Sequence, residues 1–400
     1  MELPVQKSPL PVMGHNAVAI GNTILVWGGY TTAQHIHDGV MLQMEPYIDP
    51  KLLWFYQPEY DHWHPTYTDG DIPRRTSGSG MVVINHYLYV FGGYTNMGNS
   101  NQLYRLDLNT LVWELLDNAD MKHPSPRDKF MYWVHEEKFY IFGGFGVPTC
   151  DFLSEHGSFV CDDSIQNVRG WNNQLFVYDT KLGLWSNPKC KGSVPSPRAA
   201  GATVCIRNMV YLFGGRHCDR RLNDLYVLDI HAIEWTRLIT SGLSPPGRSW
   251  HTFTAISPSH IVLYGGYSQQ RITLNDIWML DVSSLEWTTF RSTKHILPRL
   301  WHTASFTEEQ DLVIFGGCSN DILSSETLAK SHNEVFVFRF TPHTLFRLSL
   351  NVVHHHRALL ESEFPSLPET VQQHLSRRQD ICSEKDLDEE LGNARTCSIS

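Results

Sequence analysis

The sequence lacks a hydrophobic run long enough to cross a membrane, since its apolar stretches have the length of strands and not the roughly 20 residues of a transmembrane helix. No basic segment followed by an apolar stretch comes after Met1, so we expect no secretory signal. The eight cysteines form no C-x-x-C pair, which argues for reduced thiols and against a zinc or disulfide framework. We therefore expect a cytoplasmic protein that does not bind membranes, with a nuclear pool as the alternative.

Positive charge is also scarce. Lys and Arg number 32 against 42 Asp and Glu, and the net charge is −10 with histidine neutral. Because nucleic-acid binding depends on a basic surface that neutralises phosphates, this balance argues against a nucleic-acid partner. Hydrophobic residues, by contrast, make up 42% of the chain, and 12 Trp, 16 Tyr and 19 Phe are present. This composition predicts a folded chain with a large core and many strands.

A Gly-Gly pair that follows a short apolar segment recurs six times. Three of the five intervals between the second glycines are 51 residues, and the other two are longer by 13 and by 20 residues. Such a period indicates a repeat architecture with one small unit of structure per repeat. The pairs are Gly28-Gly29, Gly92-Gly93, Gly143-Gly144, Gly214-Gly215, Gly265-Gly266 and Gly316-Gly317.

Two further marks recur with the Gly-Gly pairs. Pro-Arg or Pro-Gly-Arg precedes five of them, at Pro73-Arg74, Pro126-Arg127, Pro197-Arg198, Pro246-Gly247-Arg248 and Pro298-Arg299. An apolar residue also stands seven positions before a Trp in four units, at Leu106/Trp113, Tyr178/Trp185, Leu228/Trp235 and Leu280/Trp287. The sixth unit has Leu345 where this pattern would place its Trp.

With three marks in phase, residues 10–345 resemble the kelch-repeat family. The resemblance implies an all-β fold, a six-bladed kelch β-propeller, which we place at residues 1–343. Segments such as Met209–Phe213 are rich in β-branched and aromatic residues, as strands are. Closing the ring is physically sensible, because each blade has two apolar faces that only neighbouring blades can cover.

The composition changes after the sixth unit. Residues 344–360 lack turn formers and carry apolar residues at helical spacing, which predicts a short C-terminal helical segment. Pro365 and Pro368 then predict a break before a second short helix over 369–375. We expect the helices to occupy residues 344–376 and the polar residues 377–400 to form a disordered acidic tail.

Two patterns in this segment resemble the docking boxes of cullin–RING substrate receptors. Residues 344–353 resemble the elongin-binding box, with Ser where Cys is common, and residues 367–375 resemble the cullin box. The resemblance implies docking of elongin B and elongin C, and of cullin-5 with its RING protein, with cullin-2 as the alternative. In that case the helix would bury its apolar side chains in a groove of the partner. The alternative is that the helix packs against the last blade of the propeller. The implied contact residues are Leu345, Ser349, Val353, Leu367, Pro368 and Val371.

Equivalent positions of all blades should lie at the same end of a propeller. The residues directly after the Gly-Gly pairs are mostly aromatic, with Arg216 in the fourth unit. Arg216 and one of Arg220 or Arg221 could clamp a carboxylate between two guanidinium groups, to which Ser249 could add a hydroxyl. The alternative is an ordinary loop network, in which these arginines pair with neighbouring aspartates.

The stretch GGRHCDRRLNDL over 214–225, with the segments 169–172, 246–251 and 299–303, is similar to kelch domain-containing proteins that bind C-terminal degrons. The resemblance implies a substrate-recognition subunit of an elongin–cullin RING E3 ubiquitin ligase, which binds proteins ending in Gly and promotes their ubiquitination and degradation. Arg216, Arg221 and Ser249 would hold the terminal carboxylate. The pocket around it would be lined by Trp171, Trp250, Lys129, Tyr30 and Phe145.

Two other classes of function are left open, a protein-interaction scaffold without a ligase role and a propeller enzyme. The sequence contains no G-x-S-x-G or phosphate-binding loop. The consecutive residues His354, His355 and His356 would point about 100° apart on a helix and cannot face one ion. His251 and His302 occupy matching repeat positions, which packing explains. We therefore expect a non-catalytic protein with no cofactor and no metal ion.

Overall fold

A computed structural model of the chain describes most residues between 8 and 372. Within that part of the chain the regular structure is almost entirely β-strand, and the α-helix α1 spans Leu345–His355. None of the helices described there is long and apolar enough to cross a membrane. The described ranges are 8–32, 35–37, 40–42, 47–116, 123–148, 159–162, 164, 168–290, 297–324, 327–340, 345–356, 365–369 and 371–372.

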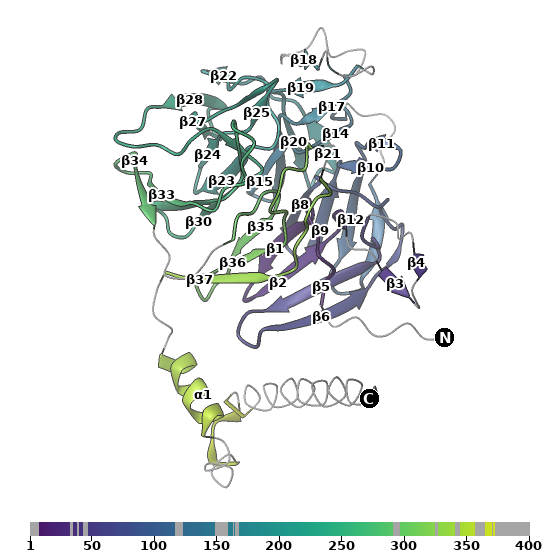
Figure 1. Ribbon diagram of the computed structural model, residues 1–400, viewed down its shortest axis with the longest axis vertical. Helices are drawn as coiled ribbons and strands as arrows, with labels where there is room; N and C mark the ends of the chain where they lie inside the picture. Colours follow the sequence, from purple (N-terminus) through teal and green to yellow (C-terminus); the bar gives the residue numbers. More distant parts are fainter. Residues whose placement is uncertain are drawn as a thin grey trace.

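Six mainly antiparallel sheets surround a common centre (Figure 1). Each innermost strand contacts the innermost strands of both neighbouring sheets, and the last one, in the sixth sheet, contacts the first. The circle is closed, so the prediction of a six-bladed β-propeller followed by a short helical segment is confirmed. The innermost strands are β1 (Asn16–Ile20), β8 (Gly80–Ile84), β15 (Met131–His135), β23 (Ala202–Ile206), β30 (Thr252–Ala255) and β35 (Thr303–Phe306).

Each blade continues outward as a meander of paired strands. The second strands are β2 (Thr23–Trp27), β9 (Tyr87–Phe91), β16 (Lys138–Phe142), β24 (Met209–Phe213), β31 (His260–Tyr264) and β36 (Asp311–Phe315). The third strands are β5 (Leu52–Gln57), β12 (Leu103–Asp107), β20 (Leu175–Asp179), β27 (Leu225–Asp229), β33 (Ile277–Asp281) and β37 (Val335–Arg339). The outermost strands of blades one to five are β6 (His62–Tyr67), β13 (Val112–Leu115), β21 (Leu184–Ser186), β28 (Glu234–Leu238) and β34 (Glu286–Phe290).

Short strands supplement the blades. β7 (Asp69–Gly70) and β22 (Lys191–Gly192) lie parallel to the outermost strands of blades two and four, so each links its blade to the chain arriving from the preceding one. The 13-residue insertion of blade one contains a hairpin of β3 (His35–His37) and β4 (Val40–Leu42).

The tryptophans of the third mark make contacts both within their own blade and with the preceding blade. Trp235 lies directly opposite Leu228 across the β27–β28 pair, and the other three apolar/Trp pairs are registered in the same way. The Trp235 ring then packs 5.0 Å from the ring of Phe142, which precedes the Gly-Gly pair of the blade before it. Trp185 packs on Phe91 and Trp287 on Phe213 at similar distances. The repeated residues are therefore the contacts that join one blade to the next.

The Gly-Gly mark provides close backbone approach. Gly215 has a φ of 101°, a value that favours glycine, and its N–H donates to the carbonyl of Arg248 in the next blade at 2.9 Å. A Cβ at this position would lie 3.0 Å from the Ala199 carbonyl oxygen. The first glycine, Gly214, accepts a hydrogen bond of 3.0 Å from Arg198 Nη1.

The arginines of the Pro-Arg mark are fully buried in four blades, at Arg127, Arg198, Arg248 and Arg299. In blade two the mark is out of phase, because Thr76 is the residue whose carbonyl accepts the N–H of the preceding blade's second glycine. Arg74 is exposed. Leu345, at the position where the repeat would place a Trp, does not belong to a fourth strand of blade six. It is the first residue of α1, which lies outside the propeller (Figure 1).

Candidate functional site

Six backbone hydrogen bonds form a closed ring around one end of the propeller axis, which we call the ring end. Each N–H donates to the carbonyl of the equivalent residue in the preceding blade at 2.7–3.0 Å, and Gly14 closes the circle by donating to Trp301. All six residues have left-handed φ values between 52° and 65°. They are Gly14, Gly78, Lys129, Ala200, Trp250 and Trp301.

Above this ring, the residue before each ring member pairs with the residue after the Gly-Gly pair of the same blade. The aromatic and cationic positions singled out in the sequence are thereby brought to one end of the molecule. The pairs are Met13–Tyr30, Ser77–Tyr94, Asp128–Phe145, Ala199–Arg216, Ser249–Tyr267 and Leu300–Cys318. The strands involved are β10 (Tyr94–Thr95), β14 (Arg127–Asp128), β17 (Phe145–Gly146), β25 (Arg216–His217), β29 (Arg248–Ser249) and β32 (Tyr267–Ser268). In blade two, β10 also pairs with β11 (Gly98–Asn99).

Arg216 and Arg221 face each other across a two-stranded ladder. β25 pairs with β26 (Arg220–Arg221), and in this register Arg216 lies opposite Arg221. Both residues are partly buried, whereas the adjacent Arg220 is exposed. Burial lowers the pKa of Arg221, and the nearby positive charge of Arg216 lowers it further. Two cations held this close, and partly removed from water, favour an anion between them.

Neither arginine pairs with a carboxylate of the described residues. Asp224, one of the expected partners, binds the buried Arg198 at 2.6 and 2.9 Å instead. Arg216 Nε donates to the carbonyl of Cys218 at 2.7 Å, and Arg221 Nε donates to Ser249 Oγ at 3.3 Å. These bonds occupy one nitrogen of each guanidinium group. The alternative of a loop network with neighbouring aspartates therefore does not describe these two side chains.

Ser249 is 0% exposed and accepts the hydrogen bond from Arg221. In this arrangement it positions the guanidinium group, and its hydroxyl proton is not used in this hydrogen bond. Sequence reasoning assigned Ser249 a direct contact with the carboxylate, which remains a prediction.

Each of the two arginines lies over an aromatic ring. Arg216 lies 5.5 Å from the Trp171 ring and Arg221 lies 4.4 Å from the Tyr267 ring. Trp171 stacks edge-on against Phe145 at 5.0 Å. Such contacts hold a guanidinium group in place without neutralising its charge.

The 20-residue insertion of blade three adds strands to this end of the molecule. β18 (Phe159–Cys161) pairs with β19 (Gly170–Asn172), and β19 pairs with β17. Trp171 on β19 is 3% exposed. From the sequence, the whole insertion over Phe145–Gly170 is expected to fold over the pocket as a flap, and its residues 149–158, 163 and 165–167 lie outside the described residues.

Lys129, Trp250 and Tyr30 complete the predicted set. Lys129 forms an ion pair with Asp128 and lies 5.6 Å from the Trp301 ring. Trp250 is 8% exposed and packs between Tyr267 at 6.0 Å and Trp301 at 5.7 Å. Tyr30 is partly buried and contacts Tyr47 edge-on at 5.6 Å. The structure therefore brings all eight predicted residues to the ring end, while Lys129 has its own carboxylate partner.

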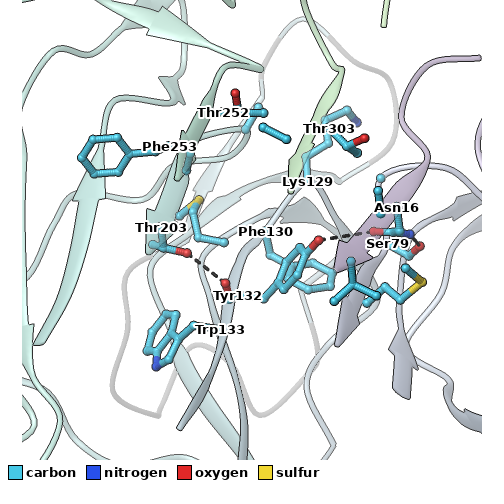
Figure 2. Close-up of a pocket in the computed structure, with 18 of the residues that line it drawn as sticks. Asn16, Ser79, Lys129, Phe130, Tyr132, Trp133, Thr203, Thr252, Phe253 and Thr303 are labelled. Carbon is cyan, nitrogen blue, oxygen red and sulfur yellow. Dashed lines mark hydrogen bonds between the residues drawn. The ribbon is translucent and has the colours of Figure 1, made fainter. Parts of the chain in front are cut away.

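A cavity of about 500 Å³ runs behind the ring end along the propeller axis, lined by residues of all six innermost strands. Its wall carries neutral polar groups. Figure 2 shows one hydrogen bond there, which the Thr203 hydroxyl donates to the main-chain carbonyl of Tyr132. Lys129, Trp250 and Trp301 line both this cavity and the ring end. His15, His251 and His302 also line it, and burial lowers the pKa of His15 and of His251 to about 3 and that of His302 well below its usual value.

Sequence reasoning missed two residues of the ring end as members of the site. Arg169 lies 4.9 Å from the rings of both Tyr94 and Phe145. Tyr47 comes from the insertion of blade one and bridges Tyr30. Arg169 belongs to the segment 169–172 already singled out, so its position was a usable signal, whereas no motif marks Tyr47.

The C-terminal helix is a second candidate site. Its residues Leu345, Leu348 and Val352 are exposed, and Val353 is partly buried. Arg347, on the same helix, is buried and joins the propeller through ion pairs with Glu309 and Asp311. Ser349 Oγ donates to the Leu345 carbonyl at 2.7 Å. The helix is thus fixed to blade six by charge, and these three apolar side chains are left uncovered.

The cullin-box residues follow a short 3₁₀ turn. Leu367 and Val371 are partly buried and Pro368 is exposed, and the N–H of Val371 donates to the Pro368 carbonyl at 2.9 Å. The predicted tail over 377–400 lies outside the described residues.

Residues 14–266 match the KLHDC2/KLHL20/DRC7 Kelch-repeats domain. The chain is 37% identical over 378 residues to kelch domain-containing protein 2 of Bos taurus, covering 92% of this chain and 91% of the relative. It is 35% identical over 375 residues to kelch domain-containing protein 1 of Homo sapiens, covering 91% and 89%. Host cell factor 2 of Homo sapiens is 28% identical over 307 residues, which are 70% of this chain and 35% of that protein.

Proposed function

The chain belongs to the kelch-repeat family, of the kelch domain-containing protein 1 and 2 type, and on that premise we propose that it is the substrate-recognition subunit of an elongin–cullin RING ubiquitin ligase. In this proposal the ring end binds the C-terminal carboxylate of proteins that end in Gly. The ligase then ubiquitinates the bound protein and marks it for degradation. The chain itself carries out no bond chemistry.

The observation that supports substrate capture is the cation pair of Arg216 and Arg221. The two side chains lie opposite each other, are partly buried among aromatic rings, and have no carboxylate partner among the described residues. A carboxylate that enters between them restores the electrostatic stabilisation lost when they left water. Since each guanidinium group has only one nitrogen bound to the protein in these contacts, the others remain for a two-oxygen ligand.

A chain terminus suits this arrangement better than an internal segment. An internal peptide bond brings no negative charge to the arginines, so it leaves them desolvated and uncompensated. A terminal Gly lets the carboxylate approach closely, because no Cβ has to pass the rings of Trp171, Trp250 and Tyr267. Specificity in this proposal comes chiefly from excluding larger terminal residues.

Binding of an extended peptide that ends in Gly tests this half of the proposal. Isothermal titration compares the free-acid peptide, the same peptide amidated, and the same peptide ending in Leu. We expect amidation to weaken binding by at least about 2–3 kcal/mol, the scale for leaving a buried charge unpaired. Equal affinity for the acid and the amide contradicts capture of the carboxylate.

The exposed apolar face of α1 supports docking of elongin B and elongin C. Leu345, Leu348 and Val352 lie on successive turns, and each exposes more than two fifths of its surface. The Ser349 hydroxyl is already hydrogen-bonded within the helix, so it enters an apolar groove at little desolvation cost. Cullin-5 is the cullin we propose for the following segment, and cullin-2 is the alternative.

Co-purification tests the ligase half. We expect elongin B and elongin C to bind the full chain and to be lost with Leu348→Asp, because an aspartate would be buried in the groove. Ile239→Asp, at an exposed position on the propeller, is the matched control and should retain binding. A chain that binds Gly-ended peptides but no elongin would be a recognition scaffold without a ligase role.

A further inference from the structure

Three residues that can bind a metal ion meet at the end of the propeller opposite the ring end. His135 is the last residue of β15, which leads away from the ring member Lys129, and Glu136 follows it in the turn to β16. His231 lies in the turn between β27 and β28 of the next blade. One ligand atom from each residue lies within 4.8 Å of the other two.

The His135 imidazole supports a bound ligand independently of that spacing. Its Nε2 atom is buried and has no hydrogen-bond partner among the described residues. Glu136 Oε1 lies 3.7 Å from Nε2, which is too long for a hydrogen bond. A buried ring nitrogen without a partner is costly, and a metal ion would satisfy it.

Nearby charges do not compete for these ligands. Lys181 binds Glu137 at 2.6 Å, and Lys138 binds Asp179 at 3.3 Å. The Glu136 carboxylate is exposed and forms no ion pair with a lysine or arginine among the described residues. His231 is exposed as well, and its ring centre lies 6.0 Å from that of His135. Both side chains are therefore free to rotate towards a common point.

We propose that His135, Glu136 and His231 bind a Zn²⁺ ion that connects blade three to blade four. Two neutral imidazoles and one carboxylate form a donor set that zinc uses in proteins, with water in the fourth position. Zn–ligand bonds of 2.0–2.1 Å place tetrahedral ligand atoms about 3.3 Å apart. Rotation of the exposed His231 and Glu136 side chains closes the remaining gap, while the partly buried His135 stays in place.

Zinc fits better than the hard cations. Mg²⁺ and Ca²⁺ prefer oxygen ligands, and two of the three donors here are nitrogen atoms. The site lies in blades three and four, opposite the ring end, whereas α1 joins blade six, so this proposal does not depend on the proposed function. The two histidines are separated by 95 residues and lie in different repeats. No sequence motif would have revealed the site.

Zinc titration of the full chain, with any affinity tag removed and metal first stripped by EDTA, tests the proposal. We expect one calorimetric site whose affinity falls more than about tenfold in His135→Gln and in His231→Gln. His260→Gln is the matched control, because His260 is another histidine near a carboxylate, with Nε2 4.0 Å from Asp281 Oδ2, and it should bind zinc as the wild type does. Co²⁺ should give visible d–d absorption in the wild type that His231→Gln removes.

Thermal unfolding in EDTA separates loss of the site from loss of the fold. His231 is exposed, so His231→Gln should unfold at the wild-type temperature in EDTA and fail to gain stability when zinc is added. Equal zinc affinity in the wild type and His231→Gln overturns the proposal. Loss of the tightest site in His260→Gln overturns it as well.

Discussion

At the scale of single residues, the same side chain serves opposite purposes in this protein. Four of the five arginines of the Pro-Arg mark are fully buried, and of these Arg198 and Arg248 each pair with an aspartate and bind a glycine carbonyl. Arg216 and Arg221 are only partly buried and have no such partner among the described residues. The buried arginines stabilise the repeat, whereas the positive charges of Arg216 and Arg221 are not paired with a carboxylate of the described residues.

We expect Arg216→Ala and Arg221→Ala each to weaken binding of a Gly-ended peptide by at least about 2–3 kcal/mol, because each leaves half of a carboxylate clamp. Arg220→Ala is the matched control, since Arg220 lies on the same strand and is exposed. Calorimetry of the three variants with one peptide makes the comparison. A loss in Arg220→Ala as large as in Arg221→Ala would place the binding surface elsewhere.

The histidines of the axial cavity predict a pH dependence of stability. Burial lowers the pKa of His15 and His251 to about 3, whereas histidine in an unfolded chain titrates near 6.5. Between these values the unfolded chain binds protons that the folded chain does not. The free energy of unfolding should therefore fall as the pH drops below about 6.5, by about 2 kcal/mol per histidine at pH 5.

Urea unfolding at several pH values measures this loss. In His251→Gln the decrease between pH 7 and pH 5 should be smaller by about 2 kcal/mol. His64→Gln, which changes an exposed histidine, should keep the wild-type decrease. An unchanged pH dependence in His251→Gln would show that His251 does not contribute.

At the scale of elements, α1 begins where the repeat would place a fourth strand. The apolar residues of 344–353 fit both a strand and a helix, and the missing Trp was the sequence signal that the repeat ends. Sequence analysis predicted the helix from its periodicity. It could not predict the Arg347 ion pairs, which depend on Glu309 and Asp311 being brought next to the helix by the fold.

We expect Arg347→Ala to loosen α1 from blade six without altering the ring end. The substitution removes the buried cation between Glu309 and Asp311, although Arg339 still binds Asp311 at 3.0 Å. Amide hydrogen exchange of residues 345–355 should become faster by at least about tenfold, while peptide affinity stays unchanged. Arg237→Ala, at an exposed site on β28, should leave the exchange unchanged.

At the scale of the whole molecule, the seam between blades one and six closes the propeller. Val12 is 2% exposed and packs in a cluster with Val26 of blade one and Phe315 of blade six. Its N–H donates to the His332 carbonyl, and its own carbonyl accepts from Gly317. The residues before the first strand thus join both ends of the repeat array.

Val12→Asp should lower the free energy of unfolding by about 3 kcal/mol or more, because it buries a charge at the seam. Ile239→Asp changes an exposed residue and should cost little. Chemical denaturation of both variants provides the test. Equal stability of the two would mean that the seam contributes little to folding.

Most of the fold could be predicted from local signals, because the repeated residues are themselves the contacts between blades. Phe142 and Trp235 are examples, since each belongs to a mark and they touch each other. The Pro-Arg mark was assigned wrongly in blade two. Thr76 stands there at the position of the buried arginine, and Pro73-Arg74 precedes it without being equivalent to the mark of the other blades.

The candidate site was predictable only in part. Its blade positions follow from the repeat, and family resemblance selected residues among them. The opposition of Arg216 and Arg221 depends on ladder register, and the burial of Ser249 depends on packing between blades. Neither the register nor the burial can be predicted from neighbouring residues in the sequence.

The hydrogen-bonded ring at the propeller end is made by main-chain atoms alone, and its six members are two glycines, a lysine, an alanine and two tryptophans. The hydrogen bonds themselves do not depend on side-chain groups, although the left-handed φ values restrict which residues fit, and a Cβ at Gly14 would lie 2.7 Å from the Trp301 ring. At the four ring positions that already carry side chains, Lys129, Ala200, Trp250 and Trp301, a substitution would change the surface of the ring end. The main-chain hydrogen bonds that join the six blades would remain after such a substitution.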